Sequence, residues 1–130
     1  PTPTGTLAEE PSFKRKLDET EVKLEAIQYT EFRIMAALSR GQNPGPESSI
    51  LKNLGADIGQ HMTELAVEAM GSYALPDQPE ARQVGRNVAP IGPADGVAAF
   101  CRFFNLRASS IAGGTNEVQK NIVAKLVLGL

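Results

Sequence analysis

The sequence predicts an all-α fold, an antiparallel helical bundle with two long helices and two shorter ones. The nine prolines fall in three regions, and since proline costs about 3 kcal/mol inside a helix, the stretches between them are where helices can run. Those stretches carry apolar residues at steps of three and four, the period of an amphipathic helix. No stretch makes a convincing strand, and no internal repeat is present.

The first long helix is expected to begin at Ser12, its predicted N-cap, and to end before Gly41. Its apolar stripe consists of Phe13, Leu17, Leu24, Ile27, Ile34, Met35 and Leu38. Glu31 lies on the same side and has two interpretations: a general base with a raised pKa, or an ordinary charge that marks the edge of the stripe or pairs with a basic residue such as Arg33 or Lys52. The second is favoured because most charges beside an apolar stripe reach solvent.

The second long helix follows a short turn over residues 44–47 and is expected to stop at Gly71. Helices joined by so short a connection pack antiparallel. Its apolar residues are Ile50, Leu51, Leu54, Ile58, Met62, Leu65, Ala66, Ala69 and Met70. Gly55 and Gly59 offer a smooth face for another helix, and His61, which has no evident catalytic partner by spacing, is expected to be packed or at an edge.

Residues 74–93 are predicted to form a loop, long enough to be functional or mobile. A third helix is expected over about Ala94–Ala108, and a fourth after Thr115, its predicted N-cap. The apolar residues of these two helices are Val97, Phe100, Cys101, Phe104 and Leu106, then Val118, Ile122, Val123, Leu126 and Val127. The four predicted helices complete the bundle.

The Gly113-Gly114 pair between the last two helices is the strongest candidate for a functional site. Neither residue has a side chain to shield its N–H, and a helix N-terminus follows directly, where unsatisfied amides and the helix dipole favour a negative oxygen. The alternative is an ordinary interhelical turn with a Thr cap, which the local sequence alone favours.

Composition excludes several classes of function. The net charge of −2 gives no case for nucleic acid, and the one basic cluster, residues 14–16, is surrounded by acidic residues. Cys101 is the single cysteine and His61 the single histidine, which excludes an internal disulfide and makes a zinc site, or any metal site, unexpected. With no signal peptide and no apolar run of about 20 residues, we expect a soluble, cytoplasmic protein without a membrane span.

The segment Arg107–Leu130, "RASSIAGGTNEVQKNIVAKLVLGL", closely resembles the C-terminal signature of the acyl-CoA dehydrogenase family of flavoenzymes. Upstream, "LAVEAMGSYAL" at 65–75 resembles the end of the family's second long helix, and residues 12–72 resemble its pair of long antiparallel helices. Family members have an N-terminal helical domain, a middle β-domain and a C-terminal four-helix bundle. The chain resembles that bundle without most of its first helix, and it begins at Pro1 with no Met. Residues 1–130 are therefore expected to be one C-terminal helical domain, a fragment of a longer flavoenzyme.

The resemblance implies a function for the longer enzyme. The family oxidises acyl-CoA thioesters with FAD: a base removes the α-proton, a hydride passes from the β-carbon to flavin N5, and an electron-transfer flavoprotein-like partner accepts the electrons. The domain would supply part of the FAD and substrate site and most of the interface of a homo-oligomer, a dimer or tetramer, with a hetero-oligomer also possible. The isolated chain is expected to be inactive because the β-domain that embraces the flavin is absent.

The resemblance also implies roles for individual residues. The backbone N–H of Gly113 would polarise the thioester carbonyl, and Thr115 and Glu117 match positions that contact the adenosine and pyrophosphate of FAD. Three further residues match the stretch that approaches the cofactor across the dimer: Glu68, Gly71 and Ser72.

Departures from the family pattern set limits on these roles. Many members carry the catalytic Glu at the Gly113 position, after an aromatic residue that is Ala112 here, so we assign no catalytic residue in this chain. The small pair hints at a bulky or branched acyl chain. Glu68 replaces a usual Gln and Ser72 a usual Gly, and a carboxylate near a pyrophosphate is unfavourable. Two alternatives remain: a catalytically silent subunit of a hetero-oligomer, and an unrelated helical bundle used for protein interaction.

Overall fold

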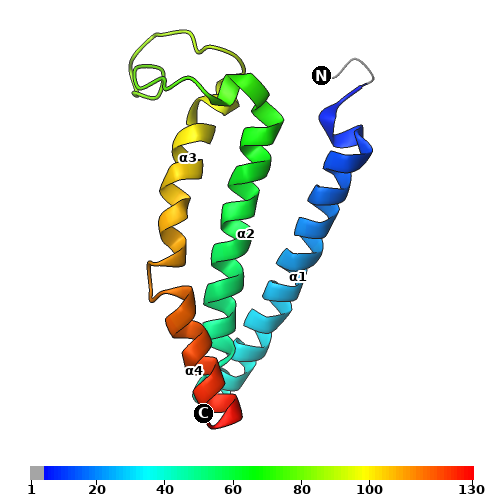
Figure 1. Cartoon of the computed structure of the whole chain (residues 1–130), viewed down its shortest axis with the longest axis vertical. Coiled ribbons are helices and arrows are strands. Elements are labelled where there is room, and N and C mark those ends of the chain that lie inside the picture. The colour runs from blue at the N-terminus through cyan, green and yellow to red at the C-terminus, as the bar shows by residue number, and fades with distance from the viewer. Residues whose placement is uncertain (1–4) are drawn as a thin grey trace. The chain divides into compact units, whose positions relative to one another are not determined.

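The computed structural model describes residues 5–130, and every regular element in that range is a helix (Figure 1). The long helices are α1 (Pro11–Ser39, 29 residues) and α2 (Glu47–Met70, 24 residues). The shorter ones are α3 (Ala99–Leu106) and α4 (Asn116–Leu128). Four 3-10 helices accompany them: η1 (Leu7–Glu9), η2 (Gly71–Ala74), η3 (Ala94–Ala98) and η4 (Arg107–Ser110). The predicted all-α fold of two long and two shorter helices is confirmed; Pro1 and Pro3, expected outside any helix, lie outside the described residues.

The chain forms two compact units, and each is described by itself. The first contains the chain as far as Ile58 together with Ser109–Leu130, and so holds α1, the first half of α2, and α4. The second is Gly59–Ala108, which holds the rest of α2, the long loop and α3. Within the described range, no helix combines the length and the apolar character needed to cross a bilayer.

The start of α1 differs from the prediction by two residues. Its N-cap is Glu10, whose carboxylate accepts the Phe13 N–H at 2.8 Å. Pro11 takes the first helical position, where a missing N–H costs nothing. Ser12 was the wrong cap, because it already lies inside the helix and donates its hydroxyl to the Glu10 carboxylate. The end is as predicted: Gly41 follows α1 with a φ of +74°, in the left-handed region that suits glycine.

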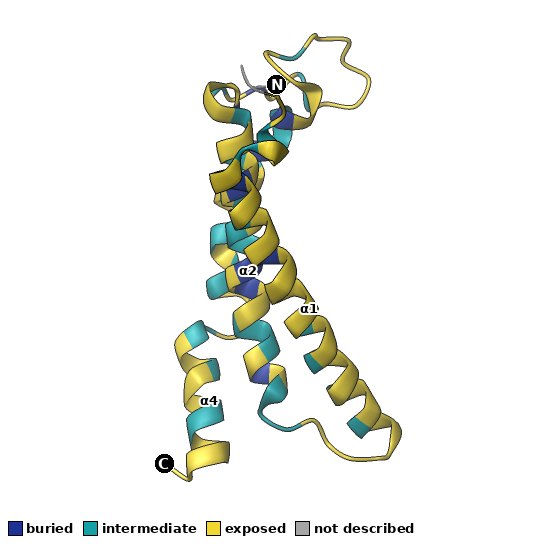
Figure 2. Cartoon of the chain, turned by 90° about the vertical axis from the view of Figure 1, so that its right-hand side faces the viewer, coloured by how far each residue is buried: buried dark blue, intermediate teal, exposed yellow. Residues whose placement is uncertain are grey.

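The apolar stripe of α1 has the predicted spacing but is largely uncovered (Figure 2). Phe13 is buried, whereas Met35 is 58% exposed. On α4, Leu126 and Val127 are 66% and 60% exposed. The buried apolar residues of the described chain are few: Phe13, Ala56, Ile58, Leu65, Ala74 and Ala99. Many residues of the predicted apolar stripes are therefore not buried, because a helical period shows which side chains share a face and not what covers that face.

In the second unit, Arg107 joins the end of α3 to α2. Its guanidinium donates to Glu64 Oε1 at 2.8 Å and to the Gln60 carbonyl at 2.9 Å, and it stacks 4.5 Å from the centre of the Phe103 ring. Gln60 returns two bonds, donating from Nε2 to the carbonyls of residues 106 and 107 at 3.3 Å. Gly59 lies on the same face, where a Cβ would approach a Leu106 methyl group at 3.2 Å. This is the close helix approach expected at Gly59; at Gly55 a Cβ would meet nothing within 4 Å.

The loop after η2 is tied across its base by one buried side chain. Gln78 accepts the Ile91 N–H at 2.7 Å and donates to the Ile91 carbonyl at 3.3 Å. Gly92, with a φ of +81°, lies against the Tyr73 ring, where a Cβ would be 2.6 Å from Cγ. The predicted loop is confirmed, and a glutamine fixes where its two ends meet.

The predicted third helix is divided into η3, α3 and η4, so only its middle is α-helical. In η3, Gly96 is buried against the end of α2, and a Cβ there would lie 2.8 Å from Met70 Sδ. Phe104, one of the apolar residues of the predicted helix, is 56% exposed.

Candidate functional site

The Gly113-Gly114 turn lies between η4 and α4, and all of residues 111–114 are exposed. Gly113 and Gly114 have φ values of +70° and +94°, a conformation that side-chain-bearing residues rarely adopt. Within residues 5–130 neither N–H makes a well-aligned hydrogen bond, although residues 111–113 form a turn that closes at Gly114. A Cβ at Gly113 would meet nothing within 4 Å. The turn thus leaves two backbone donors and open space beside the start of a helix.

Thr115 caps α4 as predicted. Its side-chain oxygen accepts the Val118 N–H at 3.2 Å, and its backbone is extended. Gln119, one turn into the helix, donates from Nε2 to the Gly113 carbonyl at 3.0 Å. The turn is thereby fixed to the first turn of α4 by its carbonyl, which leaves its N–H groups uninvolved.

Glu117 lies in the first turn of α4 and is exposed. Hydrogen bonds from its own backbone N–H and from the Thr115 hydroxyl, with a smaller contribution from the charges of Lys120 and Lys52, hold the pKa of this carboxyl below its usual range. The Glu117 carboxylate thus lies beside the start of α4. In this position it is an acceptor suited to ligand hydroxyl groups, and a phosphate would have to displace it.

A polar network that the sequence analysis missed connects α2 to this turn. Lys52 Nζ donates to Asn116 Oδ1 at 2.7 Å and to the Ser110 carbonyl at 3.4 Å. Asn53 Nδ2 donates to the Asn116 carbonyl at 3.3 Å, and Asn116 Nδ2 donates to Asp57 at 3.4 Å. The sequence carries no local signal for this network, because Lys52 and Asn53 lie between Leu51 and Leu54 at the ordinary spacing of an amphipathic helix.

Three of the predicted cofactor residues lie at the other end of α2, in the second unit. Glu68 is in the last turn of α2, and Gly71, with a φ of +53°, ends the helix as predicted and begins η2. Ser72 follows within η2. All three are exposed. They form a second group of predicted site residues, separate in the sequence from the group at the turn.

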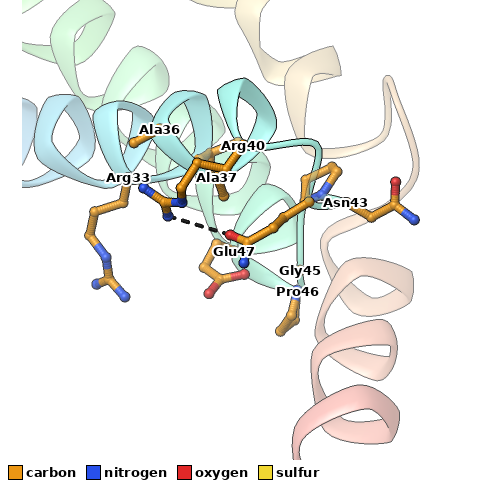
Figure 3. Close-up of a pocket in the computed structure, with 11 residues that line it drawn as sticks. Arg33, Ala36, Ala37, Arg40, Asn43, Gly45, Pro46 and Glu47 are labelled. Atoms are coloured by element: carbon orange, nitrogen blue, oxygen red, sulfur yellow. Dashed lines mark hydrogen bonds between the residues drawn. The ribbon is translucent and has the colours of Figure 1, made fainter.

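A hollow of about 660 Å³ lies where α1 leads into α2 (Figure 3). Its lining includes Ile34 and two alanines, and Arg33, Arg40 and Glu47 are its charged residues. Arg40 makes one weak hydrogen bond, to Gln42 Oε1 at 3.4 Å. Among the ion pairs of the described residues, none involves Arg33 or Arg40. The hollow therefore carries more positive than negative charge.

Glu31, His61 and Cys101 lie mostly as the sequence predicts. Glu31 is exposed and makes no ion pair in the described chain, so the edge interpretation holds while the suggested pairing with Arg33 or Lys52 does not form. His61 is at an edge, 34% exposed, with Nδ1 3.5 Å from Glu64. Cys101 is a half-buried free thiol. Across residues 5–130, no three His, Cys, Asp or Glu side chains gather in a way that could hold a metal ion.

Together, the helix order and the glycine turn before a capped final helix define an all-helical domain. The chain matches the family described as acyl-CoA dehydrogenase, C-terminal domain, over residues 2–128. It belongs to that family, whose enzymes are typically FAD-dependent oxidoreductases. Comparison with curated proteins and with solved structures found no match.

Proposed function

We propose that this chain is the C-terminal domain of an FAD-dependent acyl-CoA dehydrogenase, and that the Gly113-Gly114 turn helps to bind the acyl thioester. The observation that carries the proposal is the pair of exposed glycines, whose N–H groups make no well-aligned hydrogen bond, at a turn within a domain of this family. A backbone donor directed at a carbonyl oxygen stabilises the negative charge that develops when the α-proton leaves. Donors of this kind are worth roughly 3 to 4 kcal/mol of barrier in other enzymes.

The residues at the start of α4 fit a dinucleotide cofactor. The open space at Gly113 leaves room for a ring system to approach the backbone. Thr115 and Glu117 present acceptors that suit ribose hydroxyls. FAD, when bound, would accept the hydride from the β-carbon. The chain's own part is to hold the thioester carbonyl and one end of the cofactor.

The base is proposed to come from outside this turn. Gly113 has no carboxylate, and the lowered pKa of Glu117 makes its carboxylate a weaker base. The same observation favours the second candidate function, a silent subunit that completes the site of a catalytic partner. Exposed apolar residues on α1 and α4 suit either role, because both require an extensive contact with another domain or subunit.

The proposal is tested by the visible spectrum of the polypeptide that carries this chain. The full polypeptide should be purified with bound flavin, and anaerobic addition of a series of acyl-CoA thioesters should bleach it. Glu117→Gln should reduce flavin retention, and Glu25→Gln, at an exposed site on α1, is the matched control. A protein that stays colourless after incubation with FAD contradicts the proposal. Bound flavin that is bleached only after a partner subunit is added identifies the silent-subunit alternative.

A further inference from the structure

One ammonium group holds both ends of the glycine turn. Lys52 Nζ contacts the carbonyl of Ser110, immediately before the turn, and the side-chain oxygen of Asn116, immediately after it. The five residues between these two contacts include both glycines. The Asn116 bond, at 2.7 Å, has the length of a charge-assisted hydrogen bond.

Three residues of α2 hold Asn116 by hydrogen bonds. Besides Lys52, Asn53 donates to its backbone carbonyl and Asp57 accepts from its side-chain amide. Positions 52, 53 and 57 lie within about one and a half turns of helix, so these contacts come from one side of α2. The first residue of α4 is thus held to a rigid element, and α4 and the turn share that anchor.

Glycine cannot supply this rigidity itself. It has the widest backbone freedom of any residue, so Gly113 and Gly114 keep their positive φ values only if neighbouring contacts impose them. The contacts that do so are Gln119 on the Gly113 carbonyl and Lys52 at the two ends. Lys52 is half-buried, where an ammonium requires hydrogen-bond acceptors and where its bonds are little weakened by solvent.

We propose that Lys52 is a positioning residue for the Gly113-Gly114 turn: by bonding both flanks of the turn, it fixes the directions of the two exposed N–H groups. The effect on catalysis rests on the proposed function, but the effect on the turn does not. A donor that reorients loses most of its value for a developing oxyanion, because preorganisation is what makes the interaction effective. Lys52 therefore acts through the turn and touches no reacting atom.

The test measures backbone order at the turn in this chain by nitrogen-15 relaxation. The unaltered chain should give order parameters near 0.85 at Gly113 and Gly114, and Lys52→Met should lower them below about 0.6. Lys23→Met, at an exposed α1 position without a hydrogen bond or ion pair in the described chain, is the matched control and should change nothing at the turn. Rescue uses Lys52→Cys in a Cys101→Ser background, aminoethylated with bromoethylamine, which restores an ammonium group of nearly the same reach and should restore the order.

The outcomes separate a positioning role from general stabilisation. If Lys52→Met lowers the melting temperature while the turn stays ordered, or if aminoethylation does not restore order, the inference is overturned. Should Lys52→Met fail to fold, Asn116→Ser, which keeps the ammonium but removes its closest acceptor, must loosen the turn for the inference to stand. If the turn stays ordered in Lys52→Met while the unaltered full polypeptide retains flavin, only this inference is refuted. If the full polypeptide binds no flavin, only the proposed function is refuted.

Discussion

Replacing Arg107 by methionine should destabilise the second unit far more than breaking its ion pair. The Glu64 partner is 48% exposed and the Arg107 side chain 35%, so the pair itself contributes at most about 1 kcal/mol. The hydrogen bonds from Arg107 to two main-chain carbonyls should contribute more than this ion pair. Arg107 donates to the Gln60 and Phe103 carbonyls at 2.9 and 3.2 Å, in partly buried surroundings. Hydrogen bonds from a charged group to such acceptors contribute about 1.5 to 3 kcal/mol each.

These contributions are not additive, because all of them depend on one guanidinium position. We therefore expect Arg107→Met to lower the free energy of unfolding by about 2 to 4 kcal/mol. Glu64→Gln, which removes only the ion pair, should lower it by less than about 1 kcal/mol. Arg107→Lys should fall between the two, since an ammonium has no fork to reach both carbonyls and the carboxylate.

Urea unfolding followed by far-ultraviolet circular dichroism measures all three variants. This signal reports unfolding directly, because the regular elements of the described chain are helices. Equal losses for Arg107→Met and Glu64→Gln would refute the argument, since they would place the stabilisation in the exposed ion pair. A loss below about 0.5 kcal/mol for Arg107→Met would mean that the carbonyl contacts contribute little.

Three further experiments test other parts of the structure. Hydrogen bonds from Arg107, and less from His61, lower the pKa of Glu64. This carboxylate therefore stabilises the fold above about pH 4.3, and the stabilisation is lost as the pH falls through the lowered pKa. Acid titration of Glu64→Gln should accordingly show a less steep loss of helix than that of the unaltered chain. Thr115→Ala should cost about 1 kcal/mol by removing the cap, and Thr115→Ser should restore most of it in thermal unfolding. Gly113→Ala should destabilise the chain by about 1 to 2 kcal/mol because the φ of Gly113 is +70°. Gly55→Ala, inside α2 where a Cβ would meet nothing within 4 Å, should stabilise it by about 0.5 to 1 kcal/mol. Effects of the same sign would contradict the conformational explanation.

The helices could be predicted because their signals are local. Proline and glycine set the ends of α1 and α2, and the Thr115 cap depends on residues within three positions of it. The wrong cap at Ser12 has a local cause as well: Glu10 is an equally good acceptor, and Pro11 fits the first helical position better than it fits the position before a cap.

What the sequence could not predict depends on contacts between distant residues. The bonds from Lys52 to Asn116 and from Arg107 to Gln60 join residues 64 and 47 positions apart. The division of the third helix has the same origin, since Gly96 packs against Met70. Periodicity also identified the apolar face of α1 without showing that it stays exposed. The assigned roles of the turn and of Glu68 stay predictions.

The central claim, that the turn's N–H groups polarise a thioester carbonyl, is most directly tested by isotope-edited infrared spectroscopy. An acyl-CoA labelled with carbon-13 at its carbonyl would be bound to the flavin-containing polypeptide that carries this chain. The account predicts a carbonyl band at lower wavenumber than in the free thioester, and a smaller shift in Lys52→Met. A carbonyl band at the free-thioester position in the unaltered protein would contradict it.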